Sequence, residues 1–231
     1  MDGAAAPGVV VTIAASLAEV RARVARAAEA CGRAASEVKL VAVSKTKPAE
    51  AVREAYEAGQ RAFGENYAQE LDAKSRSLAD LPDIEWHFIG HLQSNKAKIV
   101  ARAANVVHTV DGASLARELG KRATRVLPVL IEVNVGGEAQ KHGCAPSDIA
   151  EVMAAVRAQP MLALRGLMTM PPADDPEAAR RVFETLASLR SLHGGVAALP
   201  ELSMGMSGDL EIAIASGATI VRVGTAIFGA R

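Results

Sequence analysis

The chain of 231 residues is half hydrophobic, and its Lys plus Arg count equals its Asp plus Glu count at 26 each. A net charge of zero gives no overall field to attract nucleic acid or an anionic membrane surface, so an anion must be bound by a local site. Cys31 and Cys144 lie far apart in the sequence, which argues against a disulfide framework and a cysteine metal site.

The N-terminal segment does not read as a targeting signal. It carries Asp2 and has no basic region before its apolar residues, unlike a signal peptide. No run of about eighteen apolar residues predicts a transmembrane helix. We therefore expect a soluble, cytoplasmic protein with no membrane or nucleic-acid partner.

Strands and helices alternate along the chain after one leading helix. Apolar residues recur at helical spacing over about residues 14–31, and Gly32 stands where the helix would stop. Eight apolar runs then predict strands, and a helical pattern follows each of the first seven. The predicted strands are VKLVAVS, RAFGEN, EWHFIG, VVHTVD, PVLIEVNV, ALRGLMTM, ELSMG and TIVRVGTAI.

This alternation predicts an α/β protein with a parallel sheet. Eight strand–helix units within about residues 38–231 fit a closed (β/α)8 TIM barrel, with the leading helix packed outside it. A doubly wound open sheet is the alternative, and it is disfavoured because no G-x-G-x-x-G turn follows the first strand. No linker marks a second domain, so we expect one domain over residues 1–231.

A lysine stands at the end of the first predicted strand, where barrel enzymes place their sites. Lys45 in LVAVSKTKP shares a strand face with Val41 and Val43. If that face is the interior, the amine enters a dry pocket, where desolvation favours its neutral, nucleophilic form. The residues equally allow Lys45 to be a solvated strand terminus, as Lys47 can be.

Small and hydroxyl-bearing residues follow the last two predicted strands, namely Ser203, Ser207, Gly224 and Thr225. Backbone N–H groups at the start of a helix bind phosphate, and barrels frequently place a phosphate site at these two loops. Ordinary capping of the next helix by Ser207 is the alternative.

The remaining candidates are less specific. Arg222 is a charge inside an apolar strand, and it could bond a ligand ring nitrogen or carboxylate, or pair with a nearby acid. Asn66 is placed beside Lys45, whereas we interpret His87 and His91 as hydrogen-bonded structure. The strand ends lack the cluster of carboxylates and histidines that a catalytic metal needs.

Several motifs in order resemble the YggS/PROSC family of pyridoxal 5′-phosphate (PLP)-binding homeostasis proteins: AVSKTKP, FGENYAQE, EWHFIGHLQSNK, RGLMTM, LSMGMSGDLEIAI and VRVGTAIFGAR. The resemblance implies the fold-type III vitamin B6 barrel, similar to the N-terminal domain of alanine racemase. By that resemblance Lys45 forms the internal aldimine with the cofactor. It also implies that Asn66 lies near the ring, Met206 lines the site, Arg222 faces the pyridine nitrogen, and Ser203, Ser207, Gly224 and Thr225 hold the phosphate.

The same resemblance favours a carrier over an enzyme. An arginine only donates hydrogen bonds, so it keeps the pyridine nitrogen unprotonated and the ring a poorer electron sink. A racemase of this fold adds a tyrosine from a C-terminal domain, whereas this chain ends at Arg231 and Tyr56 is expected to be remote. We expect a non-catalytic, monomeric carrier for intracellular PLP homeostasis, with PLP-dependent apoenzymes as transient recipients. The alternatives are a PLP-dependent racemase or lyase, and an aldolase-like Schiff-base enzyme acting on a sugar phosphate.

Overall fold

A closed barrel of eight parallel strands, paired in sequence order, forms the centre of the protein. The computed structural model describes residues 12–138 and 140–230. The last strand pairs with the first, which closes the barrel and confirms the predicted fold. The strands are β1 (Lys39–Val43), β2 (Ala62–Glu65), β3 (Glu85–Phe88), β4 (Val106–Val110), β5 (Leu127–Glu132), β6 (Leu162–Met168), β7 (Glu201–Ser203) and β8 (Ile220–Val223).

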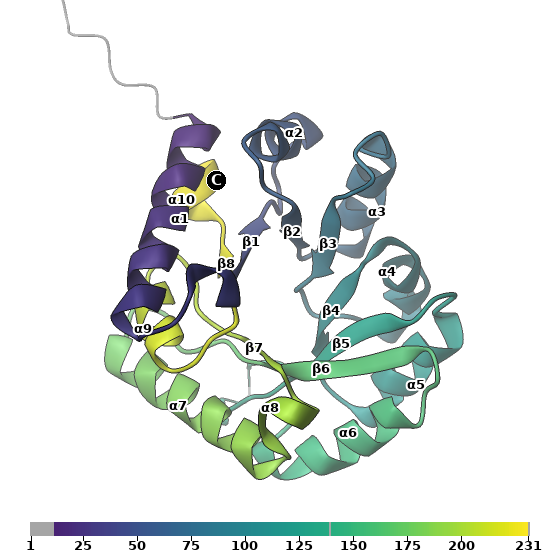
Figure 1. Cartoon of the computed structure of the whole chain (residues 1–231). Helices are drawn as coiled ribbons and strands as arrows, with labels where there is room; N and C mark the ends of the chain where they lie inside the picture. The colour runs from purple at the N-terminus through teal and green to yellow at the C-terminus, as the bar shows by residue number, and fades with distance from the viewer. Residues whose placement is uncertain (1–11, 139, 231) are drawn as a thin grey trace, which may run out of the picture.

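Helices surround the barrel on its outer side (Figure 1). They are α1 (Ile13–Ala30), α2 (Ala49–Glu57), α3 (Ala68–Ser77), α4 (Ala97–Ala103), α5 (Ala113–Arg122), α6 (Ile149–Arg157), α7 (Pro176–Leu192), α8 (Gly195–Ala198), α9 (Leu210–Ala215) and α10 (Thr225–Phe228). Short 3-10 helices occupy Ala35–Glu37, Ser94–Lys96 and Pro146–Asp148. The expected single domain also takes in residues 1–11, residue 139 and residue 231, which lie outside the described residues.

The leading helix is confirmed as α1. The Thr12 hydroxyl accepts a hydrogen bond from the Ala15 N–H at 3.2 Å, which caps the N-terminus of the helix. The apolar stripe that contains Leu17 and Val20 is buried, because α1 packs against α2, α9 and α10. The helix therefore covers the seam where β8 meets β1, beside the end of the described chain (Figure 1).

The end of the eighth predicted strand is a correction to the sequence analysis. TIVRVGTAI was expected to be one strand, but β8 ends at Val223 and the short helix α10 begins at Thr225. Gly224 lies between them, where a Cβ would come within 3.2 Å of the Val43 carbonyl oxygen. The close approach of the β1 and β8 ends favours glycine there. The sequence analysis also missed α8.

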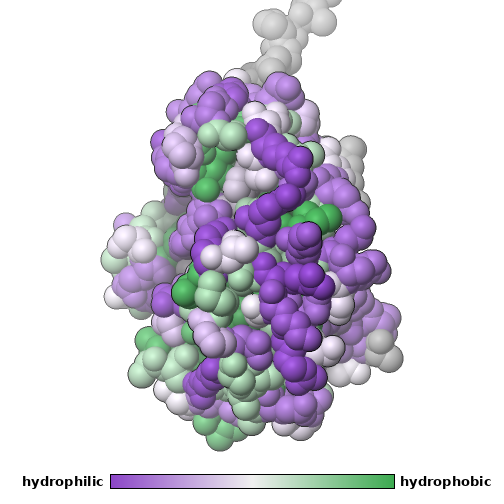
Figure 2. Space-filling model, turned by 90° about the vertical axis from the view of Figure 1, so that its right-hand side faces the viewer, coloured by the Kyte–Doolittle hydropathy of each residue, from purple (hydrophilic) through white to green (hydrophobic). Residues whose placement is uncertain are grey.

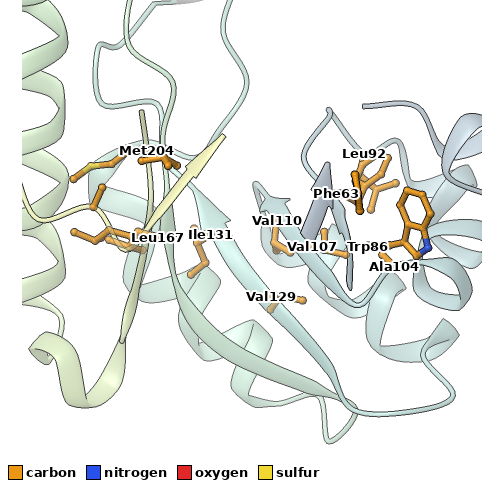
Figure 3. Packing of buried hydrophobic residues seen from close by; sticks show 14 of the residues in the cluster. Phe63, Trp86, Leu92, Ala104, Val107, Val110, Val129, Ile131, Leu167 and Met204 are labelled. Atoms are coloured by element: carbon orange, nitrogen blue, oxygen red, sulfur yellow. The ribbon is translucent and has the colours of Figure 1, made fainter. Parts of the chain in front are cut away.

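Two apolar clusters fill the two sides of the strands. Between strands and helices lie side chains such as Phe63, Trp86 and Leu167, which Figure 3 shows pointing from the sheet toward the helical layer. Inside the barrel lies a smaller cluster that includes Val41 and Met168. Val41 therefore fixes the interior face of β1, the face that Lys45 was predicted to share.

Polar residues cover much of the outer surface. On the side seen in Figure 2, hydrophilic residues predominate and hydrophobic residues form separate patches between them. Across the described ranges, none of the helices combines the length and the apolar character needed to cross a membrane.

Candidate functional site

A cavity of about 400 Å³ opens at the carboxyl ends of β1, β2 and β8. With the exception of Ser203, every residue assigned to cofactor binding from the sequence lines it: Lys45, Asn66, Met206, Ser207, Arg222, Gly224 and Thr225. Thr46 and Gly229 also line the cavity, and the sequence analysis missed both. The volume lies within the range of small-molecule sites.

The charge of the cavity wall has one sign. Lys45, Lys47 and Arg222 line it, and no Asp or Glu stands among the described residues that do so. Cations gathered at a partly enclosed surface raise the local concentration of anions. The cavity is therefore suited to an anionic ligand although the chain has no net charge.

Both lysines of the AVSKTKP motif reach this cavity. Lys45 is half-buried and follows the end of β1, on the face of Val41. The Lys47 Nζ donates to the carbonyl oxygen of Ala230 at 2.9 Å, which directs that side chain toward the C-terminal segment. The two amines thus differ in surroundings, although both are close enough to the cavity to line it.

Arg222 is buried at the floor of the cavity, with 3% of its surface exposed. Its Nη1 donates to Ser203 Oγ at 2.6 Å and its Nη2 donates to the Thr169 carbonyl oxygen at 3.0 Å. Burial lowers the pKa of Arg222 to about 10, which still leaves the guanidinium protonated at neutral pH. The sequence left open whether Arg222 pairs with an acid. Its hydrogen-bond acceptors are instead the Ser203 hydroxyl and the Thr169 carbonyl oxygen.

Ser203 lies below the cavity and is fully buried. Its Oγ is 2.8 Å from His108 Nδ1, and His108 Nε2 is 2.7 Å from His87 Nδ1. The Ser203 hydroxyl accepts from Arg222 and can donate to His108 Nδ1, which leaves the His108 Nε2–H to donate to His87 Nδ1. Desolvation, followed by the charges of His87 and Arg222, holds the pKa of His108 well below its usual value, which agrees with this neutral tautomer.

The polar groups continue toward the amino end of β3, although the hydrogen bonds do not. His87 Nε2 lies 3.4 Å from Glu85 Oε1 and has no hydrogen-bond partner among the described residues, while Lys39 Nζ bonds the same carboxylate at 2.8 Å. The interpretation of His87 as hydrogen-bonded structure is confirmed. His108 was missed, and the only sequence signal was a polar residue within the apolar strand VVHTV.

Asn66 is held at the cavity by its contact with the end of β3. A Cβ on Gly90 would come within 2.0 Å of the Asn66 carbonyl oxygen, so only glycine allows this approach. The Asn66 Oδ1 is buried and has no hydrogen-bond partner among the described residues. Buried polar atoms in proteins nearly always have partners, so this amide is suited to a ligand.

The loop after β7 forms the opposite wall. The capping alternative for Ser207 is not supported, because α9 has Asp209 at its N-cap position and no side-chain capping bond. Asp209 Oδ1 instead accepts from the Met206 N–H at 2.5 Å, and the Ser207 carbonyl oxygen accepts from Arg23 of α1 at 3.0 Å. These bonds hold the loop and leave the Ser207 hydroxyl at the cavity.

The remaining aromatic and histidine candidates lie elsewhere. The Tyr56 hydroxyl donates to Asp83 at 2.5 Å, and within the described ranges neither Tyr56 nor Tyr67 lines the cavity. His91 Nδ1 is 3.7 Å from Asp111 Oδ2, and its ring stacks on His142 with centroids 3.6 Å apart.

Comparison with known proteins agrees with this geometry. Residues 15–231 match the family described as the N-terminal domain of alanine racemase. The pyridoxal phosphate homeostasis protein of Pseudomonas aeruginosa is 51% identical over 225 residues, which cover 95% of this chain and 96% of that protein. This chain belongs to the family of pyridoxal phosphate homeostasis proteins.

Two solved structures superpose on this chain over most of its length. PipY of Synechococcus elongatus PCC7942, solved with PLP bound, is 36% identical and superposes with a TM-score of 0.79, covering 94% of this chain and all of PipY. The alanine racemase of Corynebacterium glutamicum superposes at 0.67 with 20% identity, covering 93% of this chain and 62% of that one, which shows the shared barrel alone.

Proposed function

We propose that this chain binds pyridoxal 5′-phosphate in the cavity at the carboxyl ends of the strands and serves intracellular PLP homeostasis by holding the cofactor on Lys45. The observation that carries the proposal is a half-buried amine at the interior end of β1, in a cavity lined by cations and by no described acid. PLP supplies an aldehyde that condenses reversibly with primary amines.

The residues that line the cavity supply the groups that such a ligand requires. Lys45 offers the amine, and the hydroxyls of Ser207 and Thr225 with the Gly224 backbone offer donors for a phosphate. Arg222 offers a fixed guanidinium to the ring nitrogen, and Asn66 offers its unsatisfied amide oxygen. PipY, a homologue 36% identical, has been solved with PLP bound, which supports the same ligand here.

We assign Ser203 a different role from that implied by the family resemblance. Its hydroxyl accepts from Arg222 and is bonded to His108, and it lies beneath the cavity. In this proposal Ser203 orients the guanidinium of Arg222, and the phosphate is held by Ser207, Gly224 and Thr225.

The side chains around the cavity favour holding the cofactor over turnover. Acid–base catalysis at an amino acid needs a second group besides the lysine, most often His, Tyr or a carboxylate. Among the described residues that line the cavity none is of these types, and the second amine there, Lys47, donates to the Ala230 carbonyl oxygen. We therefore propose a non-catalytic carrier that acts as a cytoplasmic monomer and passes PLP to PLP-dependent apoenzymes. The alternative is a racemase or lyase.

The absorbance spectrum with site mapping tests the covalent assignment. The purified protein incubated with PLP should be yellow, should lose this colour on borohydride reduction, and should carry the reduced label on Lys45. Lys45→Ala should abolish the colour, while the matched variant Lys47→Ala should retain it. A label that maps to Lys47, or a colourless protein as expected of an aldolase, would contradict the proposal.

Turnover and mass measurements test the carrier role. Incubation of the loaded protein with single amino acids should give no sustained racemisation or decarboxylation. Turnover that is abolished in Lys45→Ala would favour the racemase or lyase. Light scattering should give the mass of one chain, and an apoenzyme dependent on PLP should recover activity when mixed with the loaded protein.

A further inference from the structure

We propose that Glu70 and Lys74 of α3 are positioning residues for Lys45, because they fix the backbone on both sides of it. Neither of them lines the cavity. The inference rests on the proposed function, since Lys45 is the amine assigned to the cofactor. The two residues determine how rigidly the backbone holds the Lys45 amine in position for the ligand.

The first observation is a strained turn. The Lys47 N–H donates to the Ser44 carbonyl oxygen at 3.0 Å, so Lys45 and Thr46 are the central residues of a tight turn that leaves β1. Thr46 has a φ of 64°, in the left-handed region, where glycine is the usual residue of such a turn. A β-branched residue with this φ is strained and persists only when surrounding groups hold it.

Glu70 supplies the group that holds the turn. Its Oε2 accepts a hydrogen bond from the Thr46 N–H at 2.8 Å, across from α3 to the end of β1. Burial opposes ionisation of Glu70, but the hydrogen bonds from the Thr46 N–H and the Lys74 ammonium outweigh it and hold the pKa below its ordinary value. A carboxylate is a stronger acceptor than a neutral oxygen, so the charged form secures the strained residue.

Lys74 ties the other side of the turn. An ammonium has three N–H donors, and here each has its own acceptor. They bond the Ser44 carbonyl oxygen at 2.7 Å, Glu65 Oε1 at 2.7 Å and Glu70 Oε2 at 3.1 Å. The Ser44 hydroxyl also donates to Glu65 Oε1 at 2.6 Å, which closes the network on the residue before Lys45.

Lys45 therefore stands between two residues that are bound to one cluster. The Lys74 side chain is only 8% exposed and that of Glu65 is fully buried, so water competes little for the bonds on the Ser44 side, whereas Glu70, which holds Thr46, is 32% exposed. A fixed backbone reduces the entropy lost when the amine bonds a ligand. If Glu70 no longer held Thr46, the turn could relax to negative φ and displace the base of Lys45.

Amide hydrogen exchange of the cofactor-free protein tests directly whether Glu70 holds the turn at Thr46. Glu70→Ala should speed exchange of the Thr46 N–H by roughly tenfold to a hundredfold, the effect of losing one hydrogen bond to a charged group. Asp72→Ala is the matched control, because Asp72 is an acid on the same helix that pairs with Arg76 at 3.1 Å and does not touch the turn. It should leave the Thr46 exchange rate unchanged.

PLP itself provides the second measurement. With PLP bound, Glu70→Ala should lose its cofactor to hydroxylamine about tenfold faster than Asp72→Ala. The pH midpoint of the yellow absorbance should also move in Glu70→Ala and stay unchanged in Asp72→Ala. Glu70→Gln keeps an acceptor oxygen without the charge and should fall between Glu70→Ala and the unmodified protein. This milder variant also provides the test if Glu70→Ala fails to fold.

The outcomes separate this inference from the proposed function. Equal exchange at Thr46 and equal cofactor loss in the Glu70 and Asp72 variants would overturn the positioning role, while a yellow unmodified protein would still support PLP binding. A colourless unmodified protein would overturn the proposed function. In that case the exchange rates alone would decide whether Glu70 holds the turn.

Discussion

Two buried polar networks reach the cavity from opposite sides of the barrel wall, and they differ in charge. The network outside β1 and β2 is ionic, with Lys74 between Glu65 and Glu70. Inside the barrel the network that holds Arg222 is neutral, and it consists of the Ser203 hydroxyl and of His108 behind it. The ionic network holds the backbone around Lys45, and the neutral network holds the side chain of Arg222.

The difference follows from what each network must fix. The strained turn is held by charge-assisted hydrogen bonds, which a lysine between two carboxylates provides. A buried guanidinium needs acceptors for its N–H groups, and the Ser203 hydroxyl, which is bonded to neutral His108, and the Thr169 carbonyl oxygen provide them. The two networks predict separate responses to mutation and to pH.

The largest effect is expected in the ionic network. Lys74→Met should lower the free energy of unfolding by about 3–5 kcal/mol, because it leaves Glu65 buried without its charge partner. The matched change Arg76→Met on the same helix, at a side chain that is 66% exposed, should cost less than about 1 kcal/mol. Urea unfolding of both variants measures the difference, and equal values would contradict a buried, ionic role for Lys74.

A pH dependence is expected from Glu132, which lies in the field of Arg222. Desolvation, and then the charge of Asp111, raises the pKa of Glu132 from its ordinary 4.5 to about 7. A raised folded-state pKa gives stability that is complete below pH 4.5 and is lost as pH rises to about 7. The loss is on the order of 3 kcal/mol, at about 1.4 kcal/mol for each pKa unit.

The variant Glu132→Gln isolates this contribution, since it cannot ionise. Chemical unfolding across pH 4.5 to 7 should show a smaller fall in stability for the variant than for the unmodified protein. Glu85 supplies an internal contrast, because the neighbouring His87 ring, and then Lys39, hold the pKa of its carboxyl at about 2. Its stabilisation is present above pH 4.5 and is lost only as pH falls toward 2.

A smaller effect is expected in the neutral network. Ser203→Ala removes the acceptor of one Arg222 bond and should lower stability by about 1–3 kcal/mol, the cost of a buried donor left without its partner. It should also shift the absorbance maximum of bound PLP, if Arg222 faces the ring nitrogen.

Ser207→Ala, at the cavity wall, should weaken PLP binding without the loss of stability expected for Ser203→Ala. Spectral titration measures the binding, and thermal unfolding measures the stability.

The smallest effect is expected at the turn itself. Thr46→Gly removes the strain of a left-handed β-branched residue but adds freedom to the unfolded chain, so stability should change by less than about 1 kcal/mol. The more flexible turn should nevertheless release PLP faster to hydroxylamine. A release rate equal to that of the unmodified protein would show that strain at Thr46 does not govern the position of Lys45.

The sequence by itself determined the barrel and most of the cavity wall. Alternating strand and helix patterns require parallel crossovers, and residues at the carboxyl ends of such strands must meet at one face. Lys45, Asn66 and Arg222 could therefore be grouped from their positions at the predicted strand ends, and they do line one cavity.

Only the tertiary structure decided which groups hold these residues. Glu70 and Lys74 occupy polar positions of a helix and gave no usable signal, and the one signal at His108, a polar residue in an apolar strand, did not identify its partner. Their partners are on other elements, at distances set by the packing of α3 against β2 and by the closure of the barrel. Periodicity reports which face of an element is buried, whereas the pairing of buried polar groups depends on what the opposite element presents there.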